Sequence, residues 1–251
     1  MHTLRLIVVA LTLPILAACA TQKSAVNLSV GQHPERPLPH KVLLVQPDIL
    51  VHEISTGEVA EKVDEWSKQA SDHAASALAQ ASSSRGLFEV VEPGPMSPED
   101  KATLEDYSAL YALVAGSAHT AQASPYSAWR ERAAEFDYTV GPGLQEFADR
   151  NHVDAAVFLV GTDYISTAGR KAAMGVGIAM AVLTGIYAGP VSIPSFMSVG
   201  VVDMRSGDLI WYSTDVRSGG QDLRDQALMK EIVDTLLKTY PSASKSADAK
   251  K

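Results

Sequence analysis

Residues 172–202 contain no charged side chain and no histidine, and this gap constrains the fold more than any other feature of the sequence. A strand-like run at residues 153–161, Val-Asp-Ala-Ala-Val-Phe-Leu-Val-Gly, precedes it. A hairpin pattern at residues 197–216 follows, with its turn at Arg205-Ser-Gly-Asp208 and Gly207 in the left-handed conformation. The charge-free segment must therefore leave a sheet after one strand and return to it at the next.

Three interpretations of the charge-free segment are open. Apolar runs usually lie in a protein core, so the preferred expectation is a buried helix or flap that packs on the sheet. The second interpretation is an exposed surface for self-association or for a partner protein. The third is a membrane-spanning helix, because residues 172–189 are just long enough for one. Spanning fits poorly, since a helix between two strands of one sheet cannot cross a bilayer without separating them.

The second interpretation has a candidate contact surface, made of Gly175, Gly177, Gly185, Tyr187 and Gly189. Gly185-Ile-Tyr-Ala-Gly189 also matches the small-xxx-small pattern of packed membrane helices, which would fit the third interpretation. Gly175-Val-Gly177 could instead begin a dinucleotide-binding loop. However, Met180 occupies the third glycine position, and no acidic residue follows about 20 positions later. We therefore predict a contact surface at these residues and no cofactor.

The remaining sequence predicts a single mixed domain at residues 40–241. Hydrophobic residues make up 46% of the chain, which is enough for a packed core. Strand-helix-strand units favour parallel neighbours, whereas the hairpin is antiparallel. The predicted fold class is therefore α/β (α+β), a mixed sheet of about five strands with helices mainly on one face. An apolar insertion precedes the C-terminal hairpin and the final helix. We expect strands at residues 41–46 and 87–91, helices at residues 59–84, 97–119, 144–151 and 222–240, and a disordered tail at residues 242–251.

The N-terminus has the layout of a secretory signal peptide. Arg5 gives a positive start, an apolar run follows at residues 6–16, and Leu16-Ala17-Ala18-Cys19 ends it. The apolar run is too short to span a bilayer. Cys19 is the single cysteine, so no intramolecular disulfide can form. One interpretation of this layout is an ordinary secreted protein in which Cys19 has no special role.

Leu-Ala-Ala-Cys19 resembles the lipobox of bacterial lipoproteins. That resemblance implies a signal peptide at residues 1–18, cleavage before Cys19, and a covalent lipid on Cys19. Ala20 in the following position implies the outer membrane, because an Asp there tends to retain such proteins in the inner membrane. Residues 19–39 are polar and contain Pro34, Pro37 and Pro39, so we expect a lipidated tether.

Four segments of the domain resemble the core strands of bacterial envelope domains. They are Val42-Leu-Leu-Val-Gln-Pro47, residues 85–92, residues 153–161 and residues 199–211. They look like strands in the N-terminal domain of TolB, in the curli secretion lipoprotein and in the lipoprotein activator of a penicillin-binding protein. Residues 136–143 and 166–171 look closer to other outer-membrane lipoproteins of proteobacteria. The resemblance implies a non-enzymatic periplasmic module that docks onto partners, and it transfers no catalytic residue. Residues 172–202 do not alternate as a pore hairpin would.

The sequence contains no catalytic or metal-binding pattern. The net charge of −8 argues against a nucleic-acid partner, which requires a basic surface. The histidines form neither HxxxH nor HExxH pairs, and no Gly-x-Ser-x-Gly elbow is present. Asp163 could line a cleft with Arg170 and Lys171, although an ion pair on a solvated rim is the favoured interpretation. We expect neither a metal ion nor an enzymatic activity.

Together these patterns predict a lipid-anchored accessory or assembly protein of the outer membrane, facing the periplasm. It would act by contact with an envelope protein or with its own copies. One alternative is a subunit of an oligomeric export complex that uses residues 172–202 as its contact. An envelope hydrolase is the weakest alternative, because no nucleophile lies at a useful spacing from a base.

Overall fold

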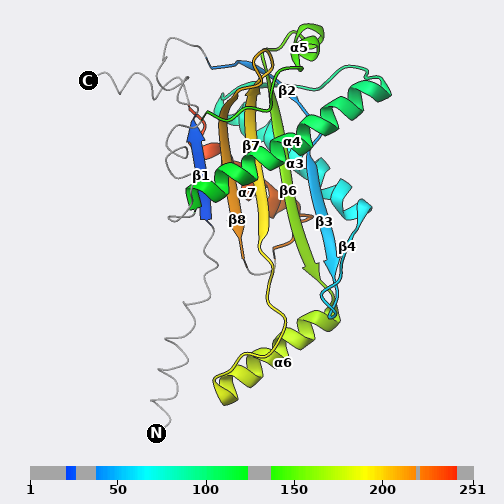
Figure 1. The fold of residues 1–251 in the computed structure, drawn as a ribbon, viewed down its shortest axis with the longest axis vertical. Helices are drawn as coiled ribbons and strands as arrows, with labels where there is room; N and C mark the ends of the chain where they lie inside the picture. Colours follow the sequence, from blue (N-terminus) through cyan, green and yellow to red (C-terminus); the bar gives the residue numbers. More distant parts are fainter. Residues whose placement is uncertain (1–20, 27–37, 124–136, 219–220, 242–251) are drawn as a thin grey trace, which may run out of the picture.

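A computed structural model of the protein describes residues 21–26, 38–123, 137–218 and 221–241, with backbone only for residues 21–26 (Figure 1). The strands are β1 (Thr21–Val26), β2 (Lys41–Leu44), β3 (Asp48–Ile54), β4 (Ala60–Lys62), β5 (Glu89–Val91), β6 (Ala155–Ser166), β7 (Ser195–Asp203) and β8 (Leu209–Arg217). The helices are α3 (Asp64–Arg85), α4 (Pro98–Ala123), α5 (Gln145–Asn151), α6 (Ala168–Thr184) and α7 (Gln226–Leu236), which a 3₁₀ turn at Leu237–Thr239 extends. The predicted signal peptide, Cys19 and the predicted tail lie outside the described residues.

The strands form one mixed sheet of eight strands, in the order β1-β8-β7-β6-β2-β5. Strand β6 is the longest and pairs with two strands on one side. Its first residues lie parallel to β2, and its later residues lie parallel to β3, which also pairs with β4. On its other side, β6 is antiparallel to β7, β7 to β8, and β8 to β1. The expected hairpin is thus confirmed at β7 and β8.

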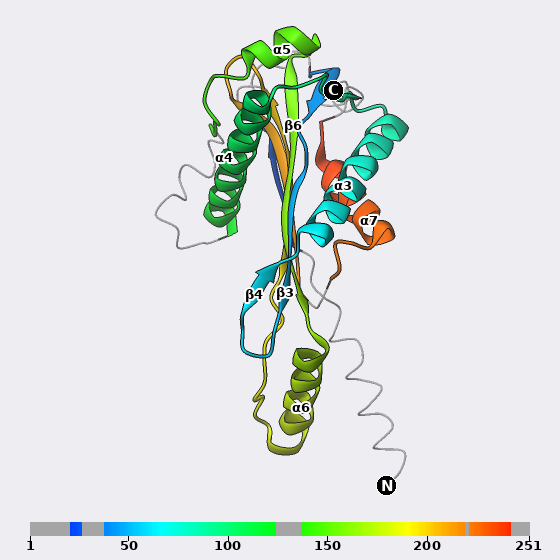
Figure 2. The same cartoon turned by 90° about the vertical axis from the view of Figure 1, so that its right-hand side faces the viewer.

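Helices cover both faces of the sheet (Figure 2). Helices α3 and α7 lie on one face and α4 on the other. In β6, Val157 and Leu159 point into the core that α3 and α7 cover, while Phe158 and Val160 point into the core that α4 covers. Because successive side chains of a strand point to opposite faces, a continuously apolar strand requires cover on both sides. The mixed α/β class is confirmed, but the sheet is larger than about five strands, and the helices are not mainly on one face.

The first strand lies inside the segment predicted as a tether. Residues 21–26 pair antiparallel with β8, from Thr21 opposite Val216 to Val26 opposite Trp211. The outer edge of β8 would otherwise present unpaired backbone groups, and an added strand covers such an edge. At the N-terminal side of α3, residues 60–62 pair with β3, so this helix begins at Asp64 rather than near Val59.

Helix α4 packs on the sheet through a buried tyrosine. The hydroxyl of Tyr111 lies 2.8 Å from Ser198 Oγ on β7, and its ring stacks on Phe158 at 5.4 Å between centroids. Gly200 lies beneath the ring, so that a Cβ built there would be 2.3 Å from Tyr111 Cε2. The glycine therefore permits the close approach of α4 to β7.

Candidate contact site: the apolar arm

Residues 168–194 form a projection that we call the apolar arm. It consists of α6 and the return segment at residues 185–194, which leads into β7. In both views the arm extends beyond the end of the sheet, at the bottom of the picture (Figures 1 and 2). The arm thus connects two neighbouring central strands, β6 and β7, as expected for the charge-free segment.

Local signals define the ends of α6. The side chain of Thr167 caps the N-terminus by accepting a hydrogen bond from the Arg170 backbone N–H at 3.3 Å. Gly185 ends the helix with a φ of 77°, and its N–H donates to the Ala181 carbonyl at 2.8 Å. Pro190 and Pro194 then keep the return segment from continuing as helix. Gly185 therefore caps the helix. The sequence pattern instead predicts a place for Gly185 on a partner surface.

A buried arginine holds the base of the arm. The Arg170 side chain is 1% exposed and forms an ion pair with Glu58 in the turn between β3 and β4. Its guanidinium also donates to the carbonyl of Ser55 at 3.5 Å and to that of Val191 at 2.7 Å. One side chain therefore links the start of α6, the β3–β4 turn and the return segment.

The expected grouping of Asp163 with Arg170 and Lys171 is wrong. Asp163 is buried and accepts hydrogen bonds from the backbone N–H groups of Leu223, at 3.0 Å, and Tyr164, at 2.9 Å. Burial raises the pKa of the Asp163 carboxyl above its usual value, although these two hydrogen bonds act in the opposite direction. Asp163 thus joins β6 to the segment before α7, while Arg170 belongs to the base of the arm.

Close backbone packing holds the return segment against α6. A Cβ at Gly177 would lie 2.9 Å from Tyr187 Cε2 and 3.0 Å from Gly189 Cα. The Tyr187 hydroxyl in turn donates a hydrogen bond to the carbonyl of Pro190. Gly177, Tyr187 and Gly189 therefore pack against each other within the arm, and the absence of a side chain at the two glycines serves this internal contact. Gly175 is exposed, with no atom within 4 Å of a Cβ built there.

Gly177→Leu should detach the return segment from α6, whereas Gly175→Leu should not. Both substitutions gain similar helix propensity, so their difference isolates the contact with the return segment. For Gly177→Leu we expect hydrogen exchange at residues 185–190 to become at least about tenfold faster, because the segment detaches locally. Mass spectrometry of peptides that cover the arm measures this. Equal exchange in the two variants would contradict the packing role of Gly177.

The arm exposes large apolar side chains instead of burying them. Val182 is 81% exposed, Leu183 is 80% and Ile186 is 69%. Further exposed apolar residues of the arm are Val176, Ile178, Met180, Tyr187 and Val191. The preferred expectation of a buried helix or flap on the sheet is therefore wrong. The physical reason is that α3, α7 and α4 already cover the two faces, so α6 continues outward from the end of β6.

The exposed positions lie around α6 rather than along one stripe. Val176, Met180 and Leu183 lie about one turn apart, while Ile178 and Val182 lie on another side of the helix. A helix that is apolar on all sides is stable when a protein core or a membrane surrounds it. Within the described residues, no helix is long and apolar enough to cross a membrane.

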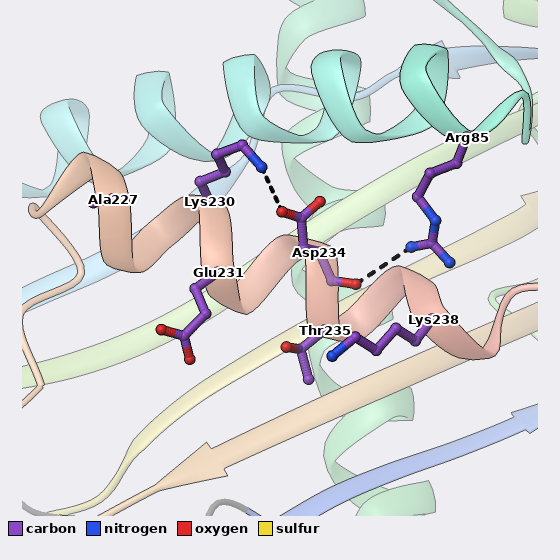
Figure 3. A pocket seen from close by; sticks show the side chains of 7 residues that line it. All are labelled: Arg85, Ala227, Lys230, Glu231, Asp234, Thr235 and Lys238. Atoms are coloured by element: carbon purple, nitrogen blue, oxygen red, sulfur yellow. Dashed lines mark hydrogen bonds and ion pairs between the residues drawn. The ribbon is translucent and has the colours of Figure 1, made fainter.

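Away from the arm, a shallow hollow lies between α3 and α7 (Figure 3). It is lined by Arg85, Ala227, Lys230, Glu231, Asp234, Thr235 and Lys238. Lys230 pairs with Asp234, and Arg85 donates to the Asp234 carbonyl at 3.3 Å. Glu231 pairs with Arg217 at 2.8 Å. An exposed pair such as Lys230 with Asp234 contributes roughly 0–1 kcal/mol and is typical of a solvated helix surface. The part of the chain that the structure describes holds no cluster of three metal-ligating side chains.

No protein-family model and no curated protein sequence matches this chain. Several solved structures match this chain, among them two at a low level of similarity. The PelC dodecamer from Paraburkholderia phytofirmans is 12% identical, with a TM-score of 0.39, and the match covers 87% of this chain and 95% of that one. A variant of the same dodecamer is 11% identical, also with a TM-score of 0.39, and the match covers 87% and 96% of the two chains. This degree of similarity assigns neither a family nor an activity.

Proposed function

We propose that this protein is a lipid-anchored accessory or assembly protein of the outer membrane, which faces the periplasm and acts by contact rather than by catalysis. The observation that supports this proposal is the apolar arm. Complete burial of a side chain such as Leu183 contributes about 1.5–3 kcal/mol. Several such side chains are exposed on the arm, so contact with an apolar surface that covers them is strongly favourable.

The rigidity of the arm supports a contact role over a catalytic one. Arg170 fixes the base, and Gly177 and Gly189 hold the return segment against the helix. A preformed apolar element loses little conformational entropy when it is covered. After Lys171, the only polar side chains in the sequence of the arm are the hydroxyl groups of Thr184, Tyr187 and Ser192. Such an element is suited to binding a partner and positioning it, and it offers no carboxylate or imidazole for acid–base chemistry.

The lipid anchor is tested by labelling cells with a radioactive fatty acid. We expect the wild-type protein to incorporate the label and to fractionate with outer membranes, and Cys19→Ser to do neither. The physical reason is that several acyl chains give stable anchoring, at about 0.8 kcal/mol per buried CH₂. Ala20→Asp is the matched control, since it keeps the thiol and should move the labelled protein to the inner membrane. Label on the Cys19→Ser protein would overturn the anchor.

A second candidate function is a subunit of an oligomeric envelope export complex. The same exposed arm favours it, because apolar surfaces of this kind also form contacts between protein copies. Light scattering of the mature Cys19→Ser chain separates the two candidates. An assembly that Leu183→Asp reduces to monomers would support the oligomer, and a monomer in both cases would exclude it.

A further inference from the structure

The pairing of β1 shows at which end of the sheet the chain from Cys19 arrives. Thr21 lies opposite Val216 of β8, and Val216 lies opposite Phe196 of β7. Phe196 is the second residue of β7, directly after the return segment of the arm. Since neighbouring strands are about 4.8 Å apart, the backbones of Thr21 and Phe196 lie about 10 Å apart.

Cys19 precedes Thr21 by two residues. An extended chain covers at most about 3.6 Å per residue, so its covalent connection keeps Cys19 within about 7 Å of Thr21. Cys19 itself lies outside the described residues, but this limit follows from bond lengths alone. Thr21 and the base of the apolar arm lie at the same end of the sheet (Figure 1), so the chain that follows Cys19 enters the domain at that end.

We propose that the apolar arm inserts into the membrane leaflet that holds the lipid of Cys19. This inference rests on the proposed lipidation of Cys19 and adds a second attachment, made by the protein itself. Two attachments at one end would orient the domain with its sheet directed away from the membrane. A lipid on Cys19 alone would leave the domain free to rotate about the short link between Cys19 and Thr21.

The length of the apolar part fits one leaflet. Residues 176–184 of α6 rise about 12 Å, at 1.5 Å per residue. Half of a bilayer's hydrocarbon core is about 15 Å thick. The first charged residues at the base are Lys171 on the surface and Arg170, which is paired with Glu58. Lys171 would lie at the height of the lipid headgroups, where cationic side chains are favourable.

Three polar groups at the tip of the arm have partners within the arm itself. The N–H of Gly185 donates to the Ala181 carbonyl, and the Thr184 hydroxyl donates to the Met180 carbonyl at 2.8 Å. The Ile186 N–H donates to Thr184 Oγ1 at 3.3 Å. The return segment contains Pro190 and Pro194, which have no N–H to satisfy. Internal satisfaction of backbone groups is what the hydrocarbon region requires.

A fluorescent probe at the tip of the full lipidated protein tests this inference. In the lipidated Leu183→Cys protein, the introduced cysteine has the only free thiol, because the thiol of Cys19 carries the lipid. Leu113→Cys on α4 is a matched control, since Leu113 is a similarly exposed leucine far from the arm. Both proteins are labelled with an environment-sensitive dye and reconstituted into vesicles of phosphatidylethanolamine and phosphatidylglycerol.

We expect spin-labelled acyl chains to quench the dye at position 183 at least about twofold, while aqueous iodide quenches only the dye at position 113. Iodide quenching of both positions would overturn the inference. Protection of position 183 from iodide without quenching by the lipid spin label would also overturn it, and would favour contact between protein copies or with another protein.

A second measurement separates this inference from the proposed lipid anchor. The mature Cys19→Ser chain carries no lipid, so its flotation with the same vesicles depends on the arm. We expect Leu183→Asp to reduce flotation at least about tenfold, because an acidic residue is strongly disfavoured in the hydrocarbon region. High salt should change it much less than Leu183→Asp does, since residues 172–194 of the arm carry no charge and only Lys171 at its base faces the anionic headgroups. Flotation that Leu183→Asp leaves unchanged would overturn insertion, whatever the result of the fatty-acid labelling.

Discussion

Glu58→Ala is expected to lower the free energy of unfolding by about 3 kcal/mol, a large effect for an exposed glutamate. The Glu58 side chain is 58% exposed, but its partner Arg170 is 1% exposed. Removal of the carboxylate leaves a buried guanidinium without its counter-charge, and breaking a buried pair typically costs about 3–5 kcal/mol. We expect the low end of that range, because water can approach from the side of Glu58. Urea denaturation measures the change.

Two further variants separate charge burial from other causes. Glu58 has a φ of 61°, and alanine keeps the same left-handed strain, so the backbone contribution cancels. Addition of Arg170→Met to Glu58→Ala should restore about 2 kcal/mol, because an apolar side chain then replaces the uncompensated cation. A double variant no more stable than Glu58→Ala would contradict this explanation. Glu58→Gln, which keeps an acceptor, should lie between the wild type and Glu58→Ala.

Gly200→Val is expected to destabilise the protein by about 3 kcal/mol, at the upper end of the cost of an overpacked core. A Cβ at position 200 would already lie 2.3 Å from the Tyr111 ring, which is fully buried and cannot move into solvent. Displacement of the ring would also break the hydrogen bond between Tyr111 and Ser198. Measurement of the urea midpoint, together with near-ultraviolet circular dichroism of the tyrosine environment, tests this.

Gly116→Ala on α4 is the matched control for Gly200→Val. No atom lies within 4 Å of a Cβ built at Gly116, and the residue lies in the interior of the helix. Alanine there should raise stability by about 0.5–1 kcal/mol through helix propensity and a smaller loss of backbone entropy. Similar losses in both variants would mean that the approach of α4 to β7 does not depend on Gly200.

The fold class and the central hairpin could be predicted from sequence because their signals are local. Apolar runs bounded by turn residues indicate strands, and Arg205-Ser-Gly-Asp208 lies at the turn between β7 and β8. The number of strands could not be predicted in the same way. Residues 21–26 have no strong strand pattern and become a strand by pairing with the free edge of β8. Cover on both faces was implicit in β6, whose apolar residues occupy both alternating positions.

The candidate site was predicted in part. The absence of charge in residues 172–202 marked the arm as a distinct element. Among the small residues predicted as its contact surface, Gly177 and Gly189 contact each other within the arm and Gly185 ends the helix, so the sequence pattern did not reveal these internal roles, and their contact with a partner stays a prediction. The exposed tip at Val182, Leu183 and Ile186 was missed, since an apolar run has the same appearance whether it is buried or exposed. The role of Arg170 was missed because its partner, Glu58, is 112 positions away.

The sequence by itself determined most of the helices, the central strands, the mixed class of the sheet and the uncharged character of the arm. These properties follow from side-chain chemistry and from its spacing along the chain. Only the tertiary structure decided that the arm lies outside the core, because helices from distant segments already occupy both faces of the sheet. It also decided that β1 runs along β8 and places Thr21 at the arm's end of the domain. Both outcomes depend on which surfaces remain uncovered after packing, and no local pattern records that.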